Sequence, residues 1–253
     1  MIPKIIHYCW LSSDPIPVKL AEYMKSWKEQ LPDYEFMLWD LDRFDINKSV
    51  WVKEAFELKK YAFAADYIRL YAIYNYGGIY LDTDVEVLQS FDQFLHLGSM
   101  ICYEKQGNQP EMAAFGAEKH SLWIKECLLY YDSRRFNVDG KLDMKILPLV
   151  INEVLALNFK WVPVNNLDEA SVSADDPYEI RILPSEFFSP KNYWTARLTV
   201  TANTVCIHHF SGSWLASYLK TEARVCEYLG IKNFKIIERI TWRLKALKLR
   251  LLR

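Results

Sequence analysis

Residues 62–84 read AFAADYIRLYAIYNYGGIYLDTD, and the prediction of the fold starts from them. The first part carries apolar side chains on nearly every side of a helix, so we expect a buried helix over Tyr61–Tyr76. Gly77-Gly78 should end this helix, because glycine adopts the left-handed conformation without a steric penalty. A short apolar strand then leads into Asp82-Thr83-Asp84. The stretch therefore predicts a buried helix, a sharp turn and a strand that ends in two acids.

Two charged residues, Asp66 and Arg69, interrupt the otherwise apolar helix. They are three positions apart, so their side chains share one face of the helix. Burying two charges costs several kcal/mol unless each finds partners. Two interpretations are open from the helix alone: a structural ion pair in the core, or a pair that binds a ligand.

The two acids after the strand, Asp82 and Asp84, are separated by one residue. Side chains alternate along a strand, so if the backbone stays extended both carboxylates point the same way. Their repulsion is then relieved by a cation or by hydrogen bonds, and oxygen ligands suit Mg²⁺ or Mn²⁺. Acids at strand ends are common, but this pair follows a buried helix that also carries charge. Together these features predict a metal site.

The rest of the chain alternates expected strands and helices, which indicates an α/β sandwich. The expected strands are Lys4–Trp10, Tyr34–Trp39, Ile79–Leu81, Met100–Tyr103, Lys160–Val164, Ile180–Leu183 and Val205–His209. The other expected helices are one that ends near Gln30, then Val50–Lys59, Ser121–Tyr131 and Met144–Leu157.

The composition is that of a globular chain. The 253 residues are 51% hydrophobic and 25% charged, which excludes disorder. Five cysteines at unrelated spacings argue against a disulfide framework or a structural zinc site and favour a reducing compartment. The N-terminal run MIPKIIHYCW shows no small-residue cleavage site, and no run reaches the roughly 18 apolar residues of a spanning helix, so we expect neither a secreted nor a transmembrane protein. We predict one domain over residues 1–230, followed by a separate helix over 231–253.

Charge is distributed unevenly along the chain. Residues 231–253 hold eight basic and one acidic residue, net +7, whereas the first 230 residues hold 23 basic and 31 acidic, net −8. The last segment has the pattern of a basic amphipathic helix, with isoleucine and leucine on one side. Such a helix either packs on the domain or lies on an anionic membrane surface, and we favour the membrane. No motif supports binding to nucleic acid.

Two stretches, residues 2–10 (IPKIIHYCW) and 62–84, closely resemble glycosyltransferase family 32, especially its bacterial capsular and exopolysaccharide members. The likeness covers roughly the first half of the chain. It implies a GT-A fold, a nucleotide-sugar-binding sandwich with a mixed central sheet. It also implies a nucleotide-sugar donor, with a UDP-hexose favoured, a divalent metal, Mn²⁺ or Mg²⁺, and retention of anomeric configuration.

The resemblance also implies roles for individual residues, with Asp66, Arg69 and Asp84 acting in catalysis. Asp84 would ligate the metal directly, while Asp82 would contact the ribose and the metal's water shell. Tyr80 would lie near the nucleotide. Asp66 and Arg69 would hold the hydroxyls of the donor sugar, so the buried pair would form the floor of the binding site.

Two further regions gain roles from the resemblance. Trp10, at the end of the first strand, would lie near the base, although a core position is equally open. Residues 208–214 read HHFSGSW and resemble a late segment that closes over the diphosphate, with Ser213 and Trp214 binding the donor. Adjacent histidines on a strand point to opposite sides, so one of them at most faces the metal. We predict His209 rather than His208.

Together with the residues, the resemblance implies a metal-dependent retaining hexosyltransferase that acts on a saccharide acceptor, expected to be lipid-linked, in bacterial surface polysaccharide (capsule) synthesis. We expect a cytoplasmic protein, peripherally bound to the inner face of the cell membrane. A haloacid-dehalogenase-type phosphatase is an alternative, but it expects Thr or Val where Glu86 stands, and its acid pair normally follows the first strand. An EF-hand loop fails at Glu86 and Val87. A non-catalytic sugar-nucleotide-binding protein is the other alternative, and the intact acid pair counts against it.

Overall fold

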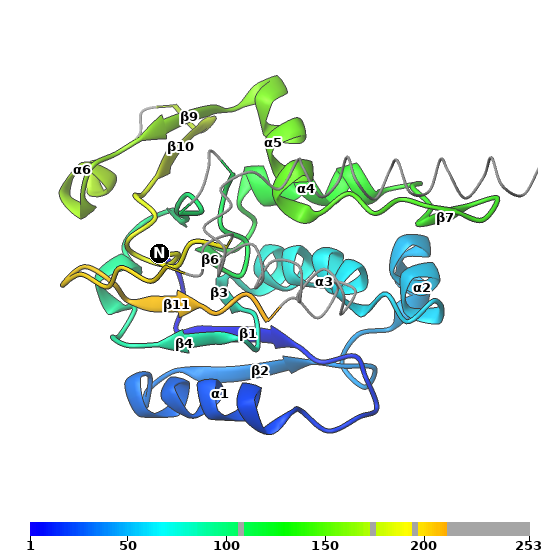
Figure 1. Cartoon of the computed structure of the whole chain (residues 1–253). Helices are drawn as coiled ribbons and strands as arrows, with labels where there is room; N and C mark the ends of the chain where they lie inside the picture. Colours follow the sequence, from blue (N-terminus) through cyan, green and yellow to red (C-terminus); the bar gives the residue numbers. More distant parts are fainter. Residues whose placement is uncertain (106–108, 173–175, 194–196, 212–253) are drawn as a thin grey trace, which may run out of the picture. The chain divides into compact units, whose positions relative to one another are not determined.

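A computed structural model describes residues 1–105, 109–172, 176–193 and 197–211 (Figure 1). They belong to one compact unit, Met1–Tyr193 with Arg197–Trp214. The proposed helix over 231–253, together with Ser213 and Trp214, lies outside the described residues. The predicted division of the chain at residue 230 therefore stays a prediction.

A five-stranded mixed sheet forms the centre of this unit, in the order β2-β1-β3-β6-β5. The strands are β1 (Ile5–Cys9), β2 (Glu35–Trp39), β3 (Gly78–Leu81), β5 (Ser99–Met100) and β6 (Ala114–Ala117). β1 pairs in parallel with both β2 and β3, while β6 runs antiparallel to β3 and to β5. The predicted α/β class with a mixed central sheet is confirmed.

Helices cover both faces of this sheet (Figure 1). On one face lies α1 (Val18–Gln30), whose Trp27 donates its indole N–H to the carbonyl of Val85 at 2.8 Å. The other face carries α2 (Val50–Glu57), α3 (Tyr61–Tyr76), α4 (Leu122–Tyr131) and α5 (Leu147–Asn158).

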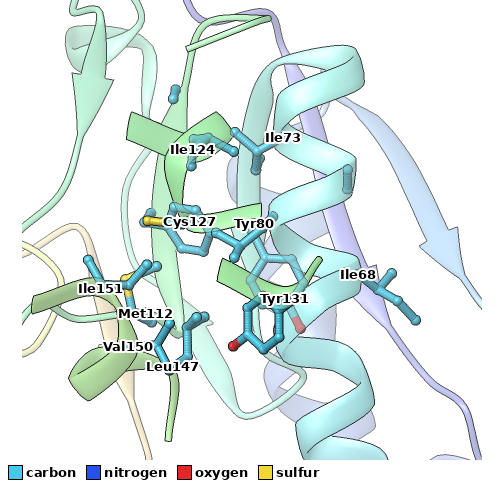
Figure 2. Close-up of a cluster of buried hydrophobic side chains, with 14 of the residues drawn as sticks. Ile68, Ile73, Tyr80, Met112, Ile124, Cys127, Tyr131, Leu147, Val150 and Ile151 are labelled. Atoms are coloured by element: carbon cyan, nitrogen blue, oxygen red, sulfur yellow. The ribbon is translucent and has the colours of Figure 1, made fainter. Parts of the chain in front are cut away.

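Alternation along β3 divides the core into two clusters. Ile79 and Leu81 pack in the cluster that contains Trp27 of α1. Tyr80 points to the opposite face, where it packs with residues of α3, α4 and α5 (Figure 2). Because these β3 side chains are at most 1% exposed, the strand that leads into the acid pair is fixed on both faces.

Smaller elements complete the unit. Among the described residues, 3₁₀ turns occur at Ile46–Lys48 and Asp92–Phe94, and α6 spans Leu167–Ser171. The short pairs are β4 (Val85–Val87) with β11 (Cys206–His208), β7 (Asn137–Val138) with β8 (Lys141–Leu142), and β9 (Lys160–Pro163) with β10 (Glu179–Ile182). The antiparallel β4–β11 pair lies directly after the acid pair, and it brings residues 206–208 beside it.

The turn between α3 and β3 admits little besides glycine. Gly78 has φ +104°, and a Cβ there would stand 2.6 Å from the carbonyl oxygen of Ile5 in β1. His7 of β1 binds the same turn, because its Nε2 donates to the carbonyl of Gly77 at 2.8 Å while its Nδ1 accepts from the Trp39 indole at 3.0 Å. Burial lowers the pKa of His7 to about 4, which keeps the ring neutral as these roles require. This close packing fixes where β3 begins.

Several predictions meet the structure directly. The helix over Tyr61–Tyr76 is confirmed to the residue, with Gly77 at positive φ as its cap. The strand expected over Ile79–Leu81 is confirmed as β3, and the backbone does not stay extended through the acid pair, because β3 ends at Leu81. The N–H of Val85 donates to the carbonyl of Asp82 at 3.0 Å and closes a turn there. Strands β4, β6, β7 and β8 were not predicted.

The cysteine and membrane predictions are tested only in part. Cys9, Cys102, Cys127 and Cys206, the described cysteines, are all free thiols. Within the described ranges, no helix combines the length and the apolar character needed to cross a membrane.

Candidate metal centre

The two acids follow β3 at the carboxyl edge of the parallel strands. Trp10 follows β1 at the same edge, because β1 and β3 are parallel with Ile6 opposite Ile79. β2 and β3 pair with opposite sides of β1, so the strand order reverses direction at β1. In open α/β sheets, ligands bind in the crevice at such a switch point.

Three side chains converge beyond this edge: Asp82, Asp84 and His208. One potential ligand atom from each lies within 4.8 Å of the others. The turn at residues 82–84 presents the two carboxylates, and the β4–β11 pairing places His208 opposite Val85. The Nε2 of His208 is 3.6 Å from Oδ1 of Asp84. Two carboxylates and an imidazole therefore face a common point.

His209, which the sequence analysis favoured as the metal ligand, points elsewhere. Its Nε2 is 2.7 Å from Oε2 of Glu86, and its ring stacks on Tyr23 of α1 with centroids 4.0 Å apart. Its backbone N–H still contributes, because it donates to the carbonyl of Asp84 at 3.0 Å. His208 takes the place predicted for His209, since neighbouring side chains at a strand end diverge.

Each aspartate is held by its own donors. The backbone N–H of Ser211 donates to Oδ2 of Asp84 at 2.6 Å, and the Tyr80 hydroxyl donates to Oδ1 of Asp82 at 2.9 Å. Burial raises the pKa of Asp82, and the charge of Asp84 adds to the effect, while Arg69 opposes it. A cation between the two carboxylates would relieve the same repulsion.

Arg69 joins the charged pair of α3 to the acid pair. Its guanidinium contacts both carboxylate oxygens of Asp82: Nη2 lies 3.2 Å from Oδ1, and Nη1 lies 3.3 Å from Oδ2. The same Nη2 lies 3.3 Å from Oδ1 of Asp66. Nη1 also donates to the carbonyl of Met112 at 2.8 Å, and the group lies 4.5 Å from the centre of the Tyr80 ring. The ion pair and the acid pair are therefore one network.

Asp66 forms the deep end of this network. Its side chain is 12% exposed, and burial raises its pKa to about 7 against the opposing charge of Arg69. The backbone N–H of Leu147, at the start of α5, also donates to it. A carboxyl group with this pKa is easily protonated near neutrality, so it can accept or donate a hydrogen bond to a sugar hydroxyl.

Tyr80 and Trp10, the other predicted donor-binding residues, have different surroundings. Tyr80 is 1% exposed, and it contacts the site through its hydroxyl, which donates to Asp82. Trp10 is half-buried on the loop after β1, where its indole N–H donates to the carbonyl of Asp14 at 2.8 Å. The donor-binding roles of these two residues stay predictions.

Glu111 and Ser189 were missed by the sequence analysis. Glu111 is 1% exposed, and its carboxylate lies 3.1 Å from Nδ1 of His208. It also accepts from the Ser189 hydroxyl at 2.6 Å and from the N–H of Ala113 at 2.9 Å. Burial lowers the pKa of His208, but the charges of Glu111 and Asp84 outweigh burial and raise it to about 9. No local sequence signal marks Glu111, because the side chains that it contacts, Ser189 and His208, are 78 and 97 residues away.

The donor set fits a divalent cation. Carboxylates suit Mg²⁺, Ca²⁺ and Mn²⁺, while an imidazole ligand is uncommon for Mg²⁺, which prefers oxygen. The carboxylates also outnumber the cationic groups around the point where the three ligands meet, so a cation balances charge there. This supports the predicted metal dependence.

Comparison with known proteins connects this site to sugar transfer. Residues 17–100 match the family described as a glycosyltransferase sugar-binding region containing a DXD motif. Inositol phosphoceramide mannosyltransferase 3 of Schizosaccharomyces pombe is 37% identical over 99 residues, 38% of this chain and 28% of that protein. Mannosyl phosphorylinositol ceramide synthase SUR1 of Saccharomyces cerevisiae is 24% identical over 284 residues, 99% of this chain and 68% of that protein.

Among solved structures, the PaToxG glycosyltransferase aligns with a TM-score of 0.48 and 18% identity, covering 62% of this chain and 69% of that one. The alignment with the S. pombe mannosyltransferase covers less than a third of that protein's length. The family match covers α1, the buried α3 and the acid pair at the end of β3. Residues 17–100 are therefore similar to a glycosyltransferase sugar-binding region, and Asp82-Thr83-Asp84 has the pattern of its DXD motif.

Proposed function

We propose that this chain is a metal-dependent glycosyltransferase that moves a hexose from a nucleoside diphosphate sugar to an acceptor with retention of configuration. The observation that carries the proposal is the convergence of Asp82, Asp84 and His208 beside a matched sugar-binding region. The carboxyl edge of the sheet is where open α/β folds bind ligands, and the three side chains supply the candidate cation site.

The leaving group of such a donor is a nucleoside diphosphate, a polyanion. A divalent cation held by Asp82, Asp84 and His208 would stabilise the charge that develops on it. The protein's own contribution is orientation. Arg69 and the Tyr80 hydroxyl fix Asp82, and the backbone N–H of Ser211 fixes Asp84.

The sugar would lie against Asp66. Arg69 already contacts Asp82, Asp66 and the carbonyl of Met112, so we assign it the task of orienting the carboxylates. Asp66 is the member of the pair that we propose to bind a hydroxyl of the donor sugar. This divides the role that the sequence analysis gave to both residues together.

The yeast relatives suggest the donor and acceptor to test. Their names specify mannose as the sugar and phosphorylinositol ceramide as the acceptor. We therefore propose GDP-mannose alongside UDP-hexoses as donors, and an anionic lipid alongside a lipid-linked saccharide as acceptors. A lipid acceptor fits the proposed membrane attachment through residues 231–253. The bacterial polysaccharide setting and the cytoplasmic location stay predictions.

The alternatives predict different chemistry. A phosphatase would use an acid after its first strand as a nucleophile, whereas here the acids follow β3 and belong to the matched region. A non-catalytic binding protein would hold the donor without turnover.

A donor panel distinguishes these functions. We would measure thermal shifts and donor hydrolysis with UDP-glucose, UDP-galactose and GDP-mannose, each with Mn²⁺ and with excess chelator. A ligand that binds only the folded state raises the melting temperature according to its affinity. We expect one donor to stabilise the protein and to release its free sugar only with Mn²⁺. Release of inorganic phosphate from sugar phosphates would indicate a phosphatase. Stabilisation without turnover, with either acceptor class present, would indicate a binding protein.

A further inference from the structure

The two ring nitrogens of His208 face different carboxylates. Nε2 lies 3.6 Å from Asp84, on the side of the candidate cation, while Nδ1 lies 3.1 Å from Oε1 and 3.2 Å from Oε2 of Glu111. Glu111 lies outside the matched residues 17–100, on the segment before β6. The family match therefore assigns it no role.

Glu111 is itself held rigidly. It accepts hydrogen bonds from the Ser189 hydroxyl at 2.6 Å and from the N–H of Ala113 at 2.9 Å, and its own N–H donates to the carbonyl of Cys102 at 2.8 Å. Both side chains of the Glu111–Ser189 pair are at most 1% exposed. A carboxylate anchored in this way offers His208 an acceptor in one fixed direction.

The direction decides which nitrogen of His208 can bind a cation. An ionised carboxylate only accepts hydrogen bonds, so the nitrogen facing it must carry the proton. Where a cation takes the place of the proton on Nε2, His208 still donates from Nδ1 to Glu111, and its Nε2 lone pair faces Asp84 and Asp82. Carboxylates commonly orient histidine ligands in this way, and their loss typically weakens metal binding ~10–100-fold.

We propose that Glu111 is a positioning residue that holds His208 in the Nδ1–H tautomer and presents Nε2 to a divalent cation shared with Asp82 and Asp84. This inference rests on the proposed metal site and extends it by a residue that is not one of the three proposed ligands. A purely structural ion pair would instead stabilise the fold without changing the affinity for metal.

The test measures Mn²⁺ binding directly, from the electron paramagnetic resonance signal of free hydrated Mn²⁺ in titrations of the full chain. We expect Glu111→Ala to weaken binding ~10–100-fold. Glu111→Gln should have a smaller effect, because the amide oxygen of glutamine can still accept from Nδ1 of His208. Glutamine also has nearly the same volume as glutamate, so this variant should keep the packing of the wild-type protein. The matched control is Glu54→Gln, since Glu54 is a carboxylate that also accepts a backbone N–H, at 3.0 Å from Asn137. The affinity of the Glu54→Gln protein for Mn²⁺ should equal that of wild type.

A double-mutant cycle with His208→Ala identifies the route of the effect. If Glu111 acts through His208, then Glu111→Ala, which weakens binding in the wild-type background, should cause no further loss of Mn²⁺ affinity in the His208→Ala background. An equal loss in both backgrounds, or wild-type affinity in folded Glu111→Gln and Glu111→Ala proteins, would overturn the inference and leave the metal site standing. Absence of Mn²⁺ binding by the wild-type chain would overturn the metal site and the inference with it.

Discussion

Replacing Asp66 and Arg69 one at a time separates a structural ion pair from a binding site. Asp66→Asn leaves the guanidinium of Arg69 with Asp82 and with the carbonyl of Met112. Arg69→Met, in contrast, removes the cation that contacts Asp66 and Asp82, and it leaves that carbonyl without its donor. The two substitutions therefore differ in what they leave unpaired.

The magnitudes follow from those partners. Arg69→Met leaves buried negative charge uncompensated, which costs ~3–5 kcal/mol of the free energy of unfolding. Asp66→Asn removes one contact of 3.3 Å at a carboxyl group whose charged form burial already disfavours, so we expect a loss of about 1 kcal/mol. If Asp66 binds the donor sugar in the transition state, the rate per folded molecule should fall ~10²-fold or more.

Urea denaturation followed by tryptophan fluorescence measures the stabilities, and donor turnover with Mn²⁺ measures the rates. Arg135→Met is the matched control, because Arg135 pairs with Glu54 while its side chain is 63% exposed, and it should cost less than about 1 kcal/mol. An Asp66→Asn protein that loses as much stability as Arg69→Met, yet turns over donor at the wild-type rate, would refute the binding role.

Three further predictions address the support of the site, the fold and the tail. Tyr80→Phe removes the hydroxyl that donates to Asp82, so unfolding free energy should fall by ~1 kcal/mol and Mn²⁺ affinity several-fold; unchanged affinity would contradict this role. Gly78→Ala should destabilise by ~2 kcal/mol or more in thermal melts, since its Cβ would stand 2.6 Å from a β1 carbonyl, whereas Gly98→Ala, with its nearest atom at 3.9 Å, should be tolerated. Removing residues 231–253 should abolish salt-sensitive sedimentation with anionic liposomes, because eight cations there supply ~1 kcal/mol each near the surface; equal binding by both chains would refute it.

Local pattern sufficed for the parts of the site that lie close together in the chain. The apolar run of Tyr61–Tyr76, the Gly77-Gly78 stop and the acids at 82 and 84 each follow from short-range stereochemistry. The same pattern could not show that Arg69 contacts Asp82 as well as Asp66, because that depends on how α3 packs against β3.

Long-range pairing decided the remainder. Glu111 and His208 meet only because β11 pairs with β4 and the segment before β6 returns beside them. β6 itself reads Ala-Phe-Gly-Ala, which has little strand propensity, and its neighbours in the sheet stabilise it instead. The direction of the two acids was argued for an extended backbone, whereas a turn follows Leu81. The two carboxylates nevertheless converge.

The most direct test of metal-dependent sugar transfer compares wild type with Asp84→Asn, using the initial rate of donor turnover as Mn²⁺ is varied. The substitution keeps the shape of the side chain and removes the charge of a proposed ligand. Asp92→Asn is the control, because Asp92 is an exposed carboxylate that pairs with Lys4. We expect saturable activation by Mn²⁺ in wild type and Asp92→Asn, and a loss of several orders of magnitude in the turnover rate of a folded Asp84→Asn protein. Full turnover by Asp84→Asn, or by wild type in excess chelator, would contradict it.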